Sequence, residues 1–129
     1  MDINYDILRF RPSIKGEHYM KPIKLQFDYL QGPIWGEYYS IALHKSVTGI
    51  RFIDEDRLLQ DIHKQMQDAY SSYYEFDGDG GACRFNQEKQ KAEKEKMLEL
   101  LKALKNRLNE LNDGSFQVED LISPEYETL

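Results

Sequence analysis

Apolar and polar residues alternate along much of the first half of the chain, a spacing expected of half-buried strands. Residues 23–30 show it most clearly, because every second side chain there is apolar. Less regular versions of the pattern predict further strands at residues 3–10, 34–43 and 48–53. The turn sequence Gln31-Gly32-Pro33 lies between two of these segments and predicts a hairpin.

The spacing of apolar residues changes to three or four after the predicted strands, which is the period of a helix. A first helix is predicted over about 55–74 with Asp54 as its N-cap, and a second over about 87–112 with Asn86 as its N-cap. The first ten positions of the second helix are almost entirely polar, so we expect them to be solvated. Residues 75–85 contain three glycines and are predicted to form a loop.

The end of the second predicted helix carries Gly114, which suits a left-handed cap. A last short strand is predicted at 116–118, and residues 119–129 are expected to form a flexible tail. Segregated strands and helices favour an α+β fold. The predicted architecture is an antiparallel sheet of about three to five strands from the N-terminal half, packed on one face by two long C-terminal helices. Residues 1–129 are predicted to form a single domain, with residues 1–53 mainly strands and 54–112 a helical pair.

The net charge of −6 comes from 23 acidic and 17 basic residues and argues against binding to a nucleic-acid backbone. The charge is unevenly distributed, with +2 over 1–53, −6 over 54–79, +4 over 80–107 and −6 over 108–129. One interpretation is that oppositely charged helix faces are solvated and attract each other. The other is an acidic patch within 54–79 that meets a basic partner.

The single cysteine, Cys83, excludes an intrachain disulfide and fits a reducing compartment. The first residues lack the basic and apolar regions of a signal peptide. No window approaches the ~20 apolar residues that span a bilayer. We therefore expect a cytoplasmic protein that binds no membrane.

Candidate catalytic and metal-binding motifs are weak. An EF-hand loop starting at Asp77 would need Asp or Asn at the position of Gly81 and glycine at the position of Ala82, so calcium is not expected. The three histidines and Cys83 have neither the spacing of metal ligands nor a link that would activate a nucleophile. The sequence therefore predicts no enzyme activity, no catalytic residue, no metal and no cofactor.

The aromatic residues are more informative. Tyr70 and Tyr73 belong to the apolar stripe of the first helix, which leaves Tyr74 and one of Tyr38 and Tyr39 for the surface. Exposed tyrosines beside carboxylates are typical of protein-binding hot spots, although such residues can also half-cover a sheet edge. The predicted partner-binding residues are Glu55, Asp56, Asp61, Asp68, Tyr74, Glu75, Asp77, Asp79 and Tyr38.

The chain resembles, in general type, the small acidic immunity proteins of bacterial toxin–immunity systems, including contact-dependent growth inhibition. The similarity lies in the length, the sheet followed by helices, the acidic aromatic segment from Tyr70 to Asp79, and the helix end and short strand within 108–120. No residue of such a family is carried over. The resemblance implies a non-enzymatic inhibitor that binds a cognate, basic, nuclease-like toxin and covers its active site.

Three other functions remain open at this point. The chain could be a phage or mobile-element inhibitor that mimics the charge of nucleic acid. It could be a small homodimeric interaction protein, joined through the leucine face of helix 87–112. It could also be a small enzyme that uses Cys83, and an unchanged phenotype on Cys83→Ala would dispose of that alternative.

Overall fold

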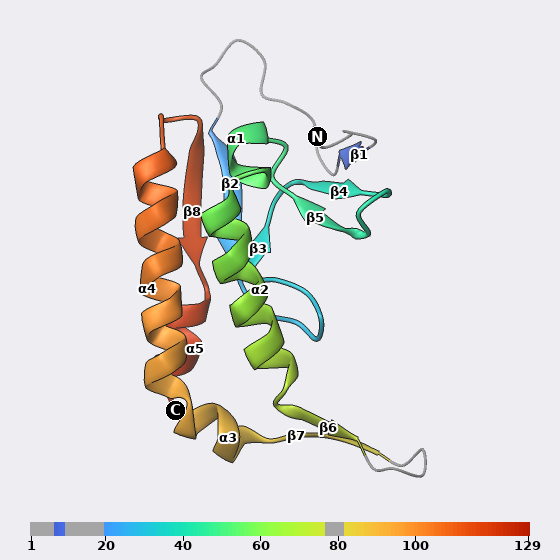
Figure 1. Cartoon of the computed structure of the whole chain (residues 1–129), viewed down its shortest axis with the longest axis vertical. Coiled ribbons are helices and arrows are strands. Elements are labelled where there is room, and N and C mark those ends of the chain that lie inside the picture. Colours follow the sequence, from blue (N-terminus) through green and yellow to red (C-terminus); the bar gives the residue numbers. More distant parts are fainter. Residues whose placement is uncertain (1–6, 10–19, 77–81) are drawn as a thin grey trace.

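The structure is a computed structural model that describes residues 7–9, 20–76 and 82–129, and only the backbone of residues 7–9 (Figure 1). The described strands are β1 (Ile7–Arg9), β2 (Lys21–Leu25), β3 (Ile34–Trp35), β4 (Tyr38–Ser40), β5 (Lys45–Val47), β6 (Tyr74–Phe76), β7 (Cys83–Phe85) and β8 (Phe116–Asp120). The described helices are α1 (Arg51–Asp54), α2 (Arg57–Ser71), α3 (Gln87–Ala92), α4 (Lys94–Leu111) and α5 (Ile122–Glu127). The chain is thus a mixed α and β protein.

The strands form small sheets instead of the single antiparallel sheet that the sequence predicted. One sheet has the order β3-β2-β8, a second has the order β1-β4-β5, and β6 pairs with β7 as a two-stranded ribbon. The predicted hairpin is confirmed, since β2 and β3 pair antiparallel. The first sheet is mixed, because β2 pairs in parallel with β8 from the far end of the chain, with Lys21 opposite Phe116.

The segment 34–43, predicted as one strand, is divided between the two sheets. The division falls at Gly36, where a Cβ atom would lie 2.2 Å from the backbone oxygen of Val47. Only glycine allows the chain to pass this close to β5 as it crosses from β3 to β4.

The strand predicted at 48–53 is wrong, because β5 ends at Val47 and α1 begins at Arg51. Asp54 causes the change of direction. Its carboxylate accepts hydrogen bonds from the backbone N–H and hydroxyl of Thr48 at 2.9 and 2.8 Å and from the N–H of Gly49 at 3.0 Å. Burial raises the pKa of Asp54, and these hydrogen bonds oppose that shift.

The first long helix is shorter than predicted. α2 spans Arg57–Ser71 and is capped by Asp56, whose side chain accepts a hydrogen bond from the N–H of Leu59 at 2.9 Å. Asp54 is therefore not the N-cap. The chain after α2 turns directly into β6, so the predicted loop 75–85 begins and ends as a β-ribbon, and its residues 77–81 lie outside the described part.

The second long helix is interrupted at Glu93, which separates α3 from α4. Asn86 is confirmed as an N-cap, since its side-chain oxygen accepts from the N–H of Lys89 at 3.0 Å. The expectation of a fully solvated start is wrong at Gln90, which is 2% exposed and donates to Glu125 at 3.4 Å.

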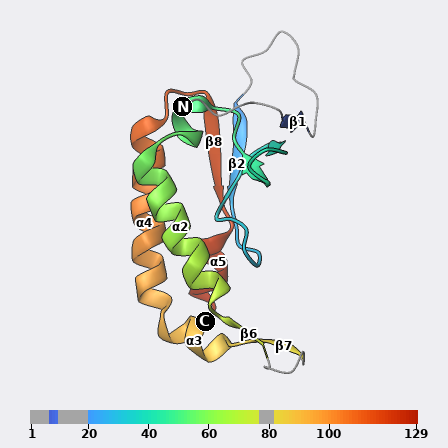
Figure 2. The ribbon, with the colours of Figure 1, turned by 45° about the vertical axis from the view of Figure 1, so that its right-hand side comes forward.

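The core collects apolar side chains from both long helices, from β2 and β8, and from α5. α2 and α4 lie side by side (Figures 1 and 2), and the leucine face of α4 is covered. Its buried members are Met97, Leu101, Leu104 and Leu108. The leucine face proposed for a homodimer through helix 87–112 is therefore occupied by the chain's own core, which gives that prediction no support.

The predicted flexible tail is also wrong. Residues 122–127 form α5, in which the side chains of Ile122 and Tyr126 are fully buried. Asp120 holds the start of α5 by accepting from the N–H groups of Ile122 and Ser123, both at 3.0 Å. No helix within the described ranges is long and apolar enough to cross a membrane.

Candidate protein-binding surface

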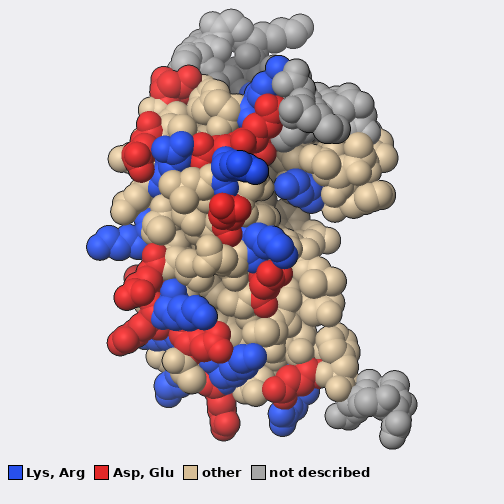
Figure 3. All heavy atoms as spheres, viewed as in Figure 1, with Lys and Arg blue, Asp and Glu red and all other residues tan. Residues whose placement is uncertain are grey.

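The predicted acidic site is dispersed, and most of its carboxylates have basic neighbours. The Asp56 carboxylate receives two hydrogen bonds from the Arg107 guanidinium, at 2.6 and 3.0 Å. Asp68 pairs with Lys64 at 3.1 Å. Figure 3 shows acidic and basic side chains interspersed over the α2 and α4 side of the molecule. A broad acidic face therefore does not form there.

The remaining predicted acids differ in their surroundings. Glu55 is half-buried and lies 3.9 Å from Arg51, whereas Asp61 is exposed on α2. Glu75 lies on the ribbon, where hydrogen bonds from Arg84 and Asn86 lower its pKa. Asp77 and Asp79 fall outside the described residues.

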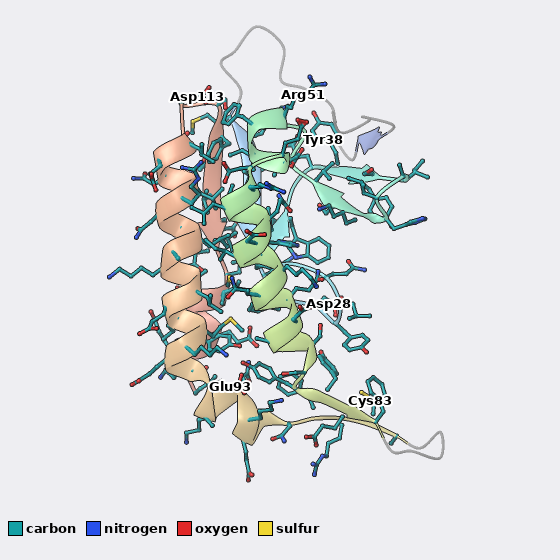
Figure 4. All side chains as sticks on the ribbon, viewed as in Figure 1. Asp28, Tyr38, Arg51, Cys83, Glu93 and Asp113 are labelled. Carbon is teal, nitrogen blue, oxygen red and sulfur yellow. The ribbon has the colours of Figure 1, made fainter. Side chains whose placement is uncertain are left out.

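Tyr38, another predicted partner-binding residue, has little accessible surface. Its side chain is only 9% exposed, and its ring packs so closely on Gly49 that a Cβ atom there would lie 2.5 Å from it (Figure 4 labels Tyr38). The ammonium of Lys21 lies 5.3 Å from the centre of its ring. The neighbouring Tyr39 is half-buried instead.

Tyr70 and Tyr73 are buried, as predicted, and they form the base of a cluster of aromatic side chains at the C-terminal end of α2. The rings of Phe27 and Tyr70 stack at a centroid distance of 4.5 Å. Phe85 contacts Tyr70 and Tyr73 at centroid distances of 5.8 and 5.9 Å. Burial raises the pKa of Tyr70 above its usual value.

The outer edge of this cluster, which we call the aromatic rim, consists of Tyr29, Tyr74 and Phe76. The ring of Tyr29 lies 4.9 Å from that of Tyr74 and 5.7 Å from that of Phe76, measured between centroids. Tyr29 is 37% exposed and Phe76 is 59% exposed, while Tyr74 is half-buried. The rim is therefore an open aromatic surface supported by rings beneath it.

The ribbon explains why Phe76 is presented outward. Side chains opposite each other in an antiparallel pair share a face. Tyr74 pairs with Phe85 and Phe76 pairs with Cys83, so these four share one face, while Glu75 pairs with Arg84 on the other. The ribbon thus has an aromatic face, continuous with the cluster, and a charged face.

A tight turn presents Tyr29 and Leu30. Asp28 and Gln31 exchange two backbone hydrogen bonds, at 3.0 and 3.1 Å, which leaves Tyr29 and Leu30 as the two turn residues. The N–H of Leu30 donates to the Ser71 hydroxyl at 3.0 Å, and this fixes the turn beside α2. Figure 4 shows Asp28 at this position.

Leu30 is strained in this turn, because it has a φ of 58° and is 60% exposed. Leucine rarely adopts this left-handed conformation, whereas asparagine tolerates it. Leu30→Asn is therefore expected to raise the free energy of unfolding by about 0.5–1 kcal/mol in urea titrations. Leu58→Asn, at an exposed helical leucine, is the matched control and should give no gain. An unchanged or lowered stability for Leu30→Asn would contradict the strain.

His63 lies on α2, beside Ile34 of β3. It is half-buried, and its Nδ1 accepts from the N–H of Ile34 at 3.4 Å. Burial, with a smaller contribution from the charge of Lys45, lowers the pKa of His63 to about 4. The folded protein therefore holds this imidazole neutral.

This pKa makes stability depend on pH. The unfolded chain binds the His63 proton near pH 6.5 and the folded chain near 4, so acidification through that window favours unfolding. About 1 kcal/mol of stability should be lost between about pH 7 and 5.5 through this group. His63→Gln should flatten that part of the profile in denaturant titrations. An equally steep profile for His63→Gln would show that other groups cause the dependence.

The geometry gives little support to metal binding or to catalysis by Cys83. Within the described ranges, no group of three or more His, Cys, Asp or Glu side chains could hold a metal ion. Cys83 is exposed on β7 and makes no hydrogen bond to a described histidine.

No protein-family model matches the chain, no curated protein matches its sequence, and no solved structure matches its fold. The function is therefore inferred from the geometry of this chain.

Sequence reasoning identified Tyr74 but missed Tyr29 as part of the same surface. Tyr29 was assigned to a strand, although it lies in the turn between Asp28 and Gln31. The signal that could have found it is the polar pair flanking two large apolar residues directly before Gly32.

Proposed function

We propose that the chain is a non-enzymatic, protein-binding inhibitor that contacts its partner through the aromatic rim. The observation that carries the proposal is the packing of the exposed Tyr29 ring, which lies 4.9 Å from the ring of Tyr74 and 5.7 Å from that of the exposed Phe76. Rings that are fixed before binding lose little side-chain entropy on association. Tyrosine is enriched at energetic hot spots, and aromatic residues in general are enriched at interfaces.

The finer proposal is an immunity-type function, in which the chain covers the active site of a basic, nuclease-like bacterial toxin. Its support is the charge near the rim. Asp28 adjoins Tyr29, and the sequence places Asp77 and Asp79 shortly after Phe76. A basic partner would be attracted to these carboxylates, so the association rate should fall as salt rises.

The alternative of a nucleic-acid mimic has less support. Such a protein needs a continuous row of carboxylates, and the acids along α2 and α4 alternate with lysines and arginines (Figure 3). An enzyme that uses Cys83 also has less support, because no described base contacts the thiol.

Affinity capture with the full chain tests the proposal. Wild type, the double variant Tyr29→Ser/Phe76→Ser and the control Leu58→Ser are immobilised separately, since Leu58 is a similarly exposed apolar residue away from the rim. We expect one protein to be retained by wild type and control and lost by the rim variant. The captured protein, once purified, should lose its activity on adding one equivalent of the chain. Equal retention by the rim variant would contradict binding through the aromatic rim. An unaffected activity of the captured protein would contradict an inhibitory function.

A further inference from the structure

A second surface lies on the other side of the Asp28–Gln31 turn, between the tip of the β4–β5 hairpin and α2. It is a hollow of about 430 Å³, which we call the hairpin–helix cleft. Leu43, His44 and Lys45 line it from the hairpin, and Leu30 lines it from the turn. The α2 side chains Gln60, His63, Lys64 and Gln67 form the remaining wall. Figure 1 shows the hairpin and the turn on the same side of α2.

The charge of the cleft is opposite in sign to that of the chain. The chain carries 23 acidic residues, but none of the described residues lining the cleft, or the smaller hollow behind it, is acidic. Two lysines and two histidines line it instead. Lys45 and His63 border both hollows and a third, very small one, so they mark the place where the three meet.

Of the two lysines that line the cleft, Lys64 is already paired with a carboxylate, and Lys45 borders the same small hollow as Asp54. Asp68 pairs with Lys64 on the exposed side of α2, where its side chain is 63% accessible. Asp54 borders only the very small hollow, and its oxygens accept three hydrogen bonds from Thr48 and Gly49. The ammonium of Lys45 donates to the Gln60 side chain at 3.4 Å, a long hydrogen bond to a neutral group. The positive charge of Lys45 also opposes the rise in the pKa of Asp54, but the two groups form no ion pair, so a bound anion can still pair with Lys45.

The cleft also offers a hydrogen-bond donor and apolar contacts. Because Nδ1 of His63 accepts from Ile34, the neutral ring carries its proton on Nε2 and can donate there. Leu30 and Leu43, which are 60% and 46% exposed, provide apolar surface at the turn and at the hairpin. A ligand that satisfies both features has a carboxylate for the cations and a short apolar body for the leucines.

We propose that the hairpin–helix cleft binds a small organic carboxylate with an apolar body. The inference does not depend on the rim or on the proposed inhibitory function. Octanoate is a suitable probe, with octanamide as the uncharged analogue and formate as the anion that lacks an apolar body.

Amide NMR titration of the full chain tests the proposal. We expect octanoate to shift the resonances of residues 43–45 and 63–67 with a dissociation constant on the order of 1 mM, and octanamide and formate to bind at least several-fold more weakly. Lys64→Gln, at an exposed lysine, should weaken octanoate binding about threefold, and Lys45→Gln about tenfold. Lys102→Gln, at an exposed lysine of α4, is the control and should change nothing. Equal binding of octanamide, shifts that map outside the cleft, no shifts, or unchanged affinity in both cleft variants would overturn the proposal.

Discussion

Replacing Tyr126 by alanine is expected to lower the free energy of unfolding by about 3–5 kcal/mol, the range for removing a large buried aromatic ring. Tyr126 is fully buried although only three residues follow it in the sequence. Its ring centroid is 6.5 Å from that of Phe27, and α5 contributes it to the same core as α2 and α4. Removing the ring would leave a cavity beneath the aromatic cluster, which urea or thermal unfolding would report.

Two variants separate this effect from a general effect of mutating the C-terminal segment. Tyr126→Phe keeps the ring and should cost about 1 kcal/mol or less. Glu127→Ala changes the exposed neighbour on α5 and should cost about 0.5 kcal/mol or less. A cost below about 1 kcal/mol for Tyr126→Ala would mean that residues 119–129 are the loose tail that the sequence suggested.

The second large effect is expected for Asp56→Ala, which should cost about 2 kcal/mol. This carboxylate caps α2 through the N–H of Leu59 and also joins α2 to α4 through Arg107. The lost cap accounts for about 1 kcal/mol, and the lost pair, which is partly accessible to solvent, for about 1 kcal/mol more. Asp56→Asn keeps a capping oxygen and should cost about half as much.

The Asp56 effect should also depend on pH. The hydrogen bonds from Arg107 hold the pKa of Asp56 below its usual value of 3.8. The carboxylate therefore stabilises the fold above the unfolded pKa, and this contribution is lost as the pH falls through the folded pKa. The stability difference between wild type and Asp56→Ala should shrink in acid. Asp61→Ala, at an exposed position of α2, should show little effect at any pH. A pH-independent cost for Asp56→Ala would contradict a role for the ion pair.

The local pattern of the sequence predicted the elements whose apolar faces are regular. The alternation around Ile23 and Leu25 predicted β2, and the three-to-four spacing predicted the body of α2 and of α4. Asn86 caps α3 as expected, whereas Gly114 has a φ of 92° but lies in the turn beyond Asn112, the C-cap of α4, so it is not the left-handed cap that was predicted. In these elements, interactions between residues close together in the sequence determine the structure.

Long-range contacts determined the parts that the sequence did not predict. The short strand at β8 was expected, but nothing local indicates that it pairs in parallel with β2 from the other end of the chain. The division of 34–43 depends on the close approach of Gly36 to β5. Ile122 and Tyr126 have helical spacing, but only their packing against the core distinguishes α5 from a tail.

The sequence predicted only part of the candidate site, because the rest of the site also depends on long-range contacts. Tyr74 was predicted to be exposed because it lies outside the apolar stripe of the predicted helix. It belongs to the rim, although it lies on β6 and not on a helix. The acidic residues were judged by their density along the chain, whereas the ion pairs of Asp56 with Arg107 and of Glu75 with Arg84 depend on the fold. Charge counted along a sequence therefore overstates the charge that a partner would meet.

The most direct test of the account is the dissociation constant of the captured partner, measured by calorimetry with wild type and with Tyr29→Ser/Phe76→Ser. If the aromatic rim is the binding surface, removing both rings should weaken binding by about 30-fold or more, which corresponds to about 2 kcal/mol. The variant should keep the circular dichroism spectrum of wild type, since both side chains are exposed. A folded variant that binds within about twofold of wild type would contradict the account.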